Sequence, residues 1–320
     1  MQKFIEVTID NNPQIPLLQW VLEHYPNLNH SITQKLIRTA AIKLNGKKAK
    51  FSIIVNKHDI IKLPIEFINS FIPAPKKVTK STVNPALYKK EISLLLNSIL
   101  YQDDDYLILN KPAGLAMQGG TKVYFHLALA LPFFKLGKSH SPYLVHRLDK
   151  DTSGVLILAR NKETSQYMFE VFKQKRITKI YNCLVYPFIN QEDTGIIKAN
   201  LLKQGATNSE QIVIDSKGKE AITKYKVLQK KDKIALLEVE PQTGRTHQIR
   251  VHMAQVLHAP IIGDFKYGAK PLKIGIDYHR LYLHAKSIEF QNAMGKTIKI
   301  TAPLPETFVS TLQKLGFTDK

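Results

Sequence analysis

The densest group of reactive side chains is the segment Leu144–Gly154, which ends in a glycine and runs into an apolar stretch. A polar loop that enters a buried strand is a common place for a scaffold to present reactive groups. Asp149 stands between Arg147 and Lys150, so its charged form should be favoured, which suits a nucleophile. The alternative interpretation is a basic, solvated turn that contains a structural aspartate.

A second group of such side chains lies in Gln242–Met253. Its Thr243-Gly244 pair is typical of a turn just before a helix. Within that helix Arg245 and Arg250 would not share one face, so we expect them to have different partners. One would pair with a carboxylate and the other with phosphate. A solvated basic helix face is the alternative.

A metal-dependent hydrolase is a competing interpretation, because several histidines fall in the C-terminal two thirds of the chain. His247 and His252, however, are five residues apart, whereas two ligands on one helical face are four apart. The sequence has no His-Glu-x-x-His motif, and its single cysteine excludes a cysteine pair for zinc. It also lacks a glycine-rich phosphate loop, which disfavours nucleotide-driven enzymes.

The elements that must position these residues are mainly strands. Apolar or alternating runs predict strands, and Thr164–Gln174 has the pattern of a helix. A predominance of strands with a few helices predicts an α+β domain over residues 93–320 with a mainly antiparallel sheet. The predicted strands are Tyr106–Asn110, Val155–Ala159, Ile180–Val185, Ile222–Val227, Ala235–Val239 and Ile298–Thr301.

Residues 1–70 predict a separate small α/β domain. Ile15–His24 has helical spacing, Ile42–Lys47 ends in the hairpin signal Asn-Gly, and His58–Pro64 reads as a closing strand. Residues 71–92, rich in proline and lysine, predict a basic linker. Residues 1–92 hold 14 Lys and Arg against 6 Asp and Glu, so this part is more basic per residue than the rest.

The charge of the whole chain points to a polyanionic partner. Its 320 residues include 46 Lys and Arg against 26 Asp and Glu, a net charge of +20, with 44% apolar residues. Nucleic acid is the commonest partner of such a chain. A lysine-rich solubilising surface and an anionic membrane surface are the alternatives. With one cysteine, no signal-like N-terminus and no long apolar run, we expect a soluble, cytoplasmic protein.

The segment His146–Gly154 resembles the signature of the RluA-type pseudouridine synthases. The resemblance extends through Tyr106–Gly114, Lys179–Tyr181, Gly244–His252 and Leu283–Ala285. The first 70 residues are similar to the S-four-type RNA-binding domain, through Leu36-Ile37-Arg38 and Ile42–Lys47. That domain departs from its usual pattern at Ala40 and Ala41, where a basic or glycine residue is common.

The resemblance implies a pseudouridine synthase fold and isomerisation of uridine within RNA. The uracil is cut from its ribose at nitrogen 1, turned and rejoined through carbon 5, and neither cofactor nor metal is needed. Asp149 matches the catalytic aspartate, Tyr181 the tyrosine that stacks on the uracil, and Arg250 the arginine that pairs with the aspartate. Leu283 matches an apolar residue that packs against the base.

Other residues are implied to contact RNA. Arg147 would fill the space that the extruded base leaves, and His146 would shape the loop without transferring a proton. The remaining RNA contacts are expected at Arg245, Arg38, Lys43 and Lys47.

The implied substrate is large-subunit ribosomal RNA, bound by a monomer. A transfer RNA synthase and a non-catalytic ribosome-assembly factor are the alternatives, although the latter would not need Asp149, Tyr181 and Arg250 together.

Overall fold

The computed structural model of the 320-residue chain divides into two compact units, Met1–Val83 and Asn84–Lys320. Among the described residues, no helix is long and apolar enough to cross a membrane. The structure describes residues 4–10, 13–25, 30–64, 88–119, 123–189, 191–205, 211–271 and 278–318.

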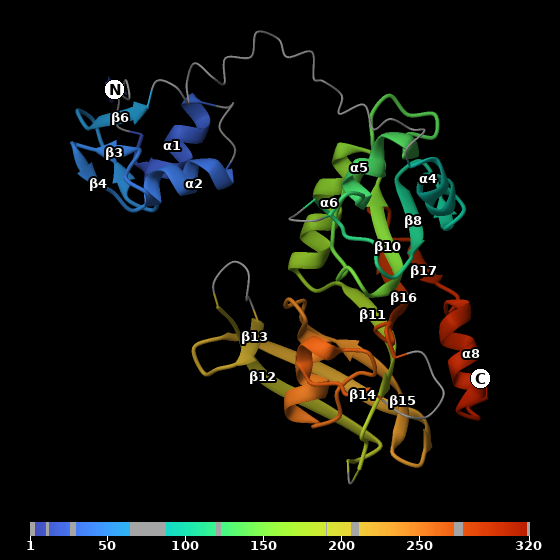
Figure 1. The fold of residues 1–320 in the computed structure, drawn as a ribbon. Helices are drawn as coiled ribbons and strands as arrows, with labels where there is room; N and C mark the ends of the chain where they lie inside the picture. The colour runs from blue at the N-terminus through green and yellow to red at the C-terminus, as the bar shows by residue number, and fades with distance from the viewer. Residues whose placement is uncertain are drawn as a thin grey trace. The chain divides into compact units, whose positions relative to one another are not determined.

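The N-terminal unit packs two helices on a small sheet of order β1-β6-β3-β4 (Figure 1). Asn45 and Gly46 both have positive φ, 49° and 73°, which confirms the predicted Asn-Gly hairpin. The elements are β1 (Phe4–Thr8), β2 (Ile15–Pro16), α1 (Leu17–His24), α2 (His30–Arg38), β3 (Lys43–Leu44), β4 (Lys47–Lys48), β5 (Ile54–Val55) and β6 (Ile60–Pro64).

The predicted linker 71–92 overlaps the start of the larger unit. Residues 71–87 of it lie outside the described residues. Helix α4 (Lys89–Leu96) already begins within the remainder and buries Ile92 and Leu95. Its first residues are charged, so composition alone placed them in a linker.

The larger unit is built on one long sheet of order β13-β12-β14-β15-β11-β16-β10-β8-β7, with β17 beside β16 and β9 beside β10. Among the described strands of this sheet, β10 and β16 are the only pair that is parallel, so the predicted α+β class with a mainly antiparallel sheet is confirmed. Its strands are β7 (Ile99–Gln102), β8 (Tyr106–Lys111), β9 (Tyr143–Leu144), β10 (Ser153–Ala159), β11 (Ile177–Val185), β12 (Thr194–Gln204), β13 (Gln211–Ile214), β14 (Lys219–Lys231), β15 (Ile234–Pro241), β16 (Leu283–Gln291) and β17 (Thr297–Thr301).

Helical segments cover this sheet, and α7 packs on β13, β14 and β15 (Figure 1). The predicted helix at 164–174 is confirmed as α6, which begins at Lys162 with the Asn161 side chain as its N-cap. The helical segments are α5 (Leu127–Ala130), η1 (Leu131–Phe134), α6 (Lys162–Lys173), α7 (Gln248–Val251), η2 (His252–Val256), η3 (Phe265–Tyr267) and α8 (Glu306–Lys314).

Strands β7, β9, β12, β13 and β16 of the larger unit are not among the predicted strands. β12 carries Lys198 and Lys203 among half-exposed residues, so it lacks the apolar run that marks the central strands. β14, by contrast, buries Ala221 and Thr223, and it is longer than the predicted 222–227.

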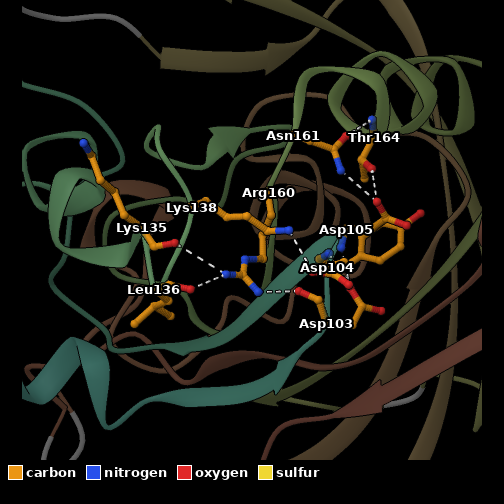
Figure 2. Close-up of polar contacts among 10 residues, drawn as sticks. Asp103, Asp104, Asp105, Lys135, Leu136, Lys138, Arg160, Asn161 and Thr164 are labelled. Atoms are coloured by element: carbon orange, nitrogen blue, oxygen red, sulfur yellow. Dashed lines mark hydrogen bonds and ion pairs between the residues drawn. The ribbon is translucent and has the colours of Figure 1, made fainter.

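Polar contacts hold the end of β8 and β10 that lies away from Asp149 (Figure 2). The Arg160 guanidinium donates to the carbonyl oxygens of Asp103 and Leu136. The Asp105 carboxylate accepts a hydrogen bond of 2.7 Å from the Asn161 amide. These contacts join the turn before β8 to the start of α6, so the two central strands are fixed at this end.

Candidate active site

The loop that carries Asp149 is held where β10 begins. Gly154, with φ of 114°, pairs in parallel with Ala285, and a Cβ atom added to it would lie 2.2 Å from the Ala285 carbonyl oxygen. Only glycine allows this approach, which explains the glycine at the end of the reactive segment. The approach also sets the Asp149 loop beside the first residues of β16.

A buried lysine supports the same loop. The Lys111 ammonium donates to the carbonyl oxygens of Pro112, Leu115 and Lys150, at 2.9, 3.0 and 3.0 Å. Burial lowers the pKa of Lys111 to about 7, while the carboxylates of Asp151 and Asp149 oppose this shift. Three carbonyl acceptors also favour the ammonium form, so Lys111 fixes the backbone next to Asp149.

The structure brings the predicted catalytic residues to one pocket of about 260 Å³. Asp149 comes from the loop before β10, Tyr181 from β11, Arg250 from α7 and Leu283 from β16. Arg147, His146 and Arg245 line the same pocket. A neighbouring hollow also includes Asp149, Arg147 and Arg250.

Arg250 lies between two carboxylates. Its Nε and Nη2 each donate a hydrogen bond of 2.7 Å to Asp264, and its Nη1 lies 3.5 Å from Oδ2 of Asp149. Burial opposes the charge, but the hydrogen bonds and the field of Asp264 raise the pKa of Arg250. Arg250 therefore lies near Asp149, as the resemblance implies, but its contact with Asp264 is the shorter one. No pattern in the sequence points to Asp264, which lies in the loop just before η3.

Tyr181 is half-buried on β11, between Val239 of β15 and Ala285 of β16. Burial, and secondly the carboxylate of Asp149, raise the pKa of the Tyr181 hydroxyl, so it keeps its proton at neutral pH. Leu283 is 3% exposed and belongs to the core that packs against Tyr181. The pocket therefore has an aromatic and an aliphatic wall beside the carboxylate, as stacking on a base would require.

His146 is bound to the sheet. Its Nε2 accepts a hydrogen bond of 2.8 Å from the backbone N–H of Ile157, and its ring stacks on Phe172. Burial lowers the pKa of His146 to about 3, so the ring is neutral. Arg147, the next residue, is exposed and lines both hollows.

The helix that carries Arg250 begins later than the Thr243-Gly244 turn suggests. It starts at Gln248, because His247 adopts a left-handed conformation with φ of 53°. The Gln248 amide donates to the Ile222 carbonyl and the Thr223 hydroxyl of β14. Arg245 thus lies outside the helix, exposed, with its Nε donating to a backbone carbonyl.

The remaining predicted RNA contacts lie in the N-terminal unit. Arg38 ends α2, while Lys43 and Lys47 lie on the two strands of the Asn-Gly hairpin. Arg38 and Lys47 are exposed and Lys43 is half-buried. In the described part of the chain, no three His, Cys, Asp or Glu residues are grouped so that they could hold a metal ion.

The comparisons with known proteins agree with this fold and pocket. The model of the RNA pseudouridylate synthase family matches residues 105–255, which include Asp149, Tyr181 and Arg250. The solved structure of human RNA Pseudouridylate Synthase Domain Containing 4 superimposes with a TM-score of 0.61 at 27% identity, covering 71% of this chain and 95% of that one. The larger unit thus has the pseudouridine synthase fold, as the resemblance implied.

Relatives that match nearly the full length of the chain define its class of protein more closely. The chain is 36% identical to Ribosomal large subunit pseudouridine synthase C of Rickettsia typhi, over 95% of this chain and 99% of that protein. It is 34% identical to the protein of the same name from Buchnera aphidicola subsp. Baizongia pistaciae, over 98% of this chain and 97% of that protein. The chain belongs to the RNA pseudouridylate synthase family, in its RluA-type branch, and is an RNA-modifying isomerase.

Proposed function

We propose that this isomerase converts uridine to pseudouridine in large-subunit ribosomal RNA, with Asp149 as the catalytic carboxylate. The observation that supports the role of Asp149 is its position in the pocket, 3.5 Å from Arg250 and beside the protonated Tyr181. The near-full-length relatives named for the large ribosomal subunit support the choice of RNA. A ribosomal substrate also supports a cytoplasmic location.

The proposed reaction breaks the bond between uracil nitrogen 1 and the ribose and forms the bond between carbon 5 and the same ribose carbon. The carbon 5 proton is lost and nitrogen 1 regains a proton, so no co-reactant is consumed. Asp149 acts as nucleophile or stabiliser at the sugar or base. Tyr181 stacks on the extruded uracil and Leu283 packs against it, while exposed Arg147 replaces the base in the RNA.

The N-terminal unit is proposed to be an S-four-type RNA-binding domain. Its basic residues Arg38, Lys43 and Lys47 lie near one another in sequence around the Asn-Gly hairpin. Such a domain would neutralise phosphates and add affinity that falls with salt. The proposal favours a long ribosomal RNA over a small transfer RNA stem.

The decisive experiment maps pseudouridine in ribosomal RNA from cells with and without this gene, complemented with wild type or Asp149→Asn. We expect specific large-subunit sites to disappear and to return only with wild type. An unchanged ribosomal map with lost transfer RNA sites would move the substrate to transfer RNA. Restoration by Asp149→Asn would contradict the catalytic role of Asp149.

A further inference from the structure

His247 lies beside Asp149, and its two ring nitrogens have different neighbours. Nδ1 lies 2.6 Å from the hydroxyl oxygen of Tyr267, and Nε2 lies 3.8 Å from Oδ2 of Asp149. The rings of His247 and Tyr267 meet edge-on, with their centroids 5.5 Å apart. The side chain of His247 therefore links a buried tyrosine to the carboxylate in the pocket.

The hydroxyl of Tyr267 decides which nitrogen of His247 carries the proton. Tyr267 is 6% exposed, and its hydroxyl oxygen accepts the backbone N–H of Ile212 in β13 at 3.3 Å. Among the described residues, His247 Nδ1 is the one acceptor within reach of the hydroxyl proton. A buried hydroxyl without an acceptor is costly, so Tyr267 donates to Nδ1.

With Nδ1 as an acceptor, the neutral ring of His247 carries its proton on Nε2, which faces Asp149. Burial lowers the pKa of His247, with Asp149 opposing and Arg250 assisting this shift, and the neutral ring is favoured. His247 is therefore a hydrogen-bond donor toward the pocket.

Two donors approach the same oxygen of Asp149. Nε2 of His247 lies 3.8 Å from Oδ2, and Nη1 of Arg250 lies 3.5 Å from the same atom. Among the described residues, Oδ1 accepts no hydrogen bond. Catalytic contacts of this length often shorten once the substrate is bound. The arrangement distinguishes two oxygens that would otherwise be equivalent.

We propose that His247 is a positioning residue that, together with Arg250, holds Oδ2 of Asp149 so that Oδ1 meets the extruded uridine. This inference rests on the proposed role of Asp149. The hydrogen-bond chain from Ile212 through Tyr267 keeps the donor of His247 directed at Oδ2. Fixing the carboxylate before the substrate arrives removes a rotation that would lower the rate.

Two substitutions of His247 separate its role as a hydrogen-bond donor to Asp149 from its role in the left-handed backbone conformation. Gln places an amide N–H near the position of Nε2, whereas the shorter Asn reaches only the region of Nδ1. Because φ is 53° at this position, the backbone favours Asn, which tolerates the left-handed region better than Gln. If only the backbone conformation mattered, His247→Asn would be the milder change. The proposal instead predicts that His247→Gln is the milder change for the reaction rate.

The test uses the full chain and an RNA that carries the mapped uridine, under single-turnover conditions. We expect His247→Asn to lower the rate constant roughly 100-fold, with RNA affinity within a few fold and a Tm at or above that of His247→Gln. His247→Gln should stay within about tenfold of wild type. Tyr267→Phe should slow the reaction, with no further loss when it is added to His247→Asn.

Wild-type rates for His247→Asn, or equal rates for the Asn and Gln variants, would overturn the proposal. Asp149→Asn is measured in parallel. If it stays active, the role of Asp149 fails as well; if it is inactive while His247→Asn is not, only the role of His247 fails. If His247→Asn does not fold, the other two variants test the proposal. A slow His247→Gln variant, or a Tyr267→Phe variant at the wild-type rate, would overturn it.

Discussion

Arg250 is held by Asp264 through two hydrogen bonds of 2.7 Å, while its remaining terminal nitrogen faces Asp149 at 3.5 Å. Asp264 is 2% exposed and Arg250 is 8% exposed, so both charges are removed from water. The hydrogen bonds from Asp264 orient the guanidinium, so that its positive charge lies next to the Asp149 carboxylate. Asp264 thus acts on the pocket without lining its 260 Å³ hollow.

Asp264→Asn should reduce both activity and stability. It leaves the buried Arg250 charge without its closest partner, which should cost about 3 to 5 kcal/mol in the free energy of unfolding. The rate constant for isomerisation should fall at least tenfold with RNA affinity unchanged, because Arg250 is no longer oriented. Urea denaturation and single-turnover assays measure the two effects.

Glu289→Gln, at an exposed pair with Lys299, is the control and should change stability by less than about 1 kcal/mol. A wild-type rate in Asp264→Asn would contradict the role of Asp264.

Gly154→Ala should prevent the close approach of β10 and β16. Its Cβ would lie 2.2 Å from the Ala285 carbonyl oxygen, so the backbone has to shift. Gly295 is the matched control: it also has positive φ, 78°, but nothing lies within 4 Å of an added Cβ. We expect Gly295→Ala to cost about 1 to 2 kcal/mol from the backbone conformation alone. Gly154→Ala should cost several times more, and equal melting temperatures of the two variants would rule out the steric explanation.

The sequence predicts most of the central strands but misses β16, and it predicts the contacts around the Asp149 carboxylate poorly. β8 and β10 are buried along their length, so they appear as apolar runs. β12 lies near one end of the sheet and alternates irregularly, and so no strand was predicted there. Asp264 and Tyr267 contact Arg250 and His247 through tertiary geometry, which no spacing in the sequence encodes. The resemblance identified Arg250, but only the structure shows that Asp264 is its closer partner.

Two buried histidines should make the protein sensitive to acid. Burial lowers the pKa of both His252 and His284 to about 4 from 6.5. Between these values the unfolded chain binds protons that the folded protein does not, so stability is full above pH 6.5 and falls as the pH drops toward 4. At pH 5 each histidine should cost roughly 2 kcal/mol relative to neutral pH.

Urea denaturation at pH 7 and pH 5 tests this prediction. Carboxylates also titrate in acid, so the informative quantity is the difference between wild type and His284→Gln. The variant should lose roughly 2 kcal/mol less than wild type over the same interval, because a glutamine cannot be protonated. An identical loss in both proteins would show that His284 does not titrate differently in the folded state.

The proposed RNA-binding role of the N-terminal unit predicts a specific change in salt dependence. Replacing Arg38, Lys43 and Lys47 with glutamine removes three positive charges around the Asn-Gly hairpin. If each neutralises one phosphate, the slope of log affinity against log salt should become shallower by about 2 to 3. The single-turnover rate at saturating protein should stay within a few fold of wild type, since no residue of the pocket changes.

The control for that experiment removes the same charge elsewhere. Lys233, Lys296 and Lys314 are exposed lysines of the larger unit, and none of them lines the pocket. Their replacement with glutamine lowers the net charge equally, so it reports the long-range field of the whole chain. We expect this variant to bind more weakly at low salt with a slope close to wild type. Equal slopes for the two triple variants would mean that the hairpin makes no phosphate contacts of its own, and that the basic N-terminal unit acts only through net charge.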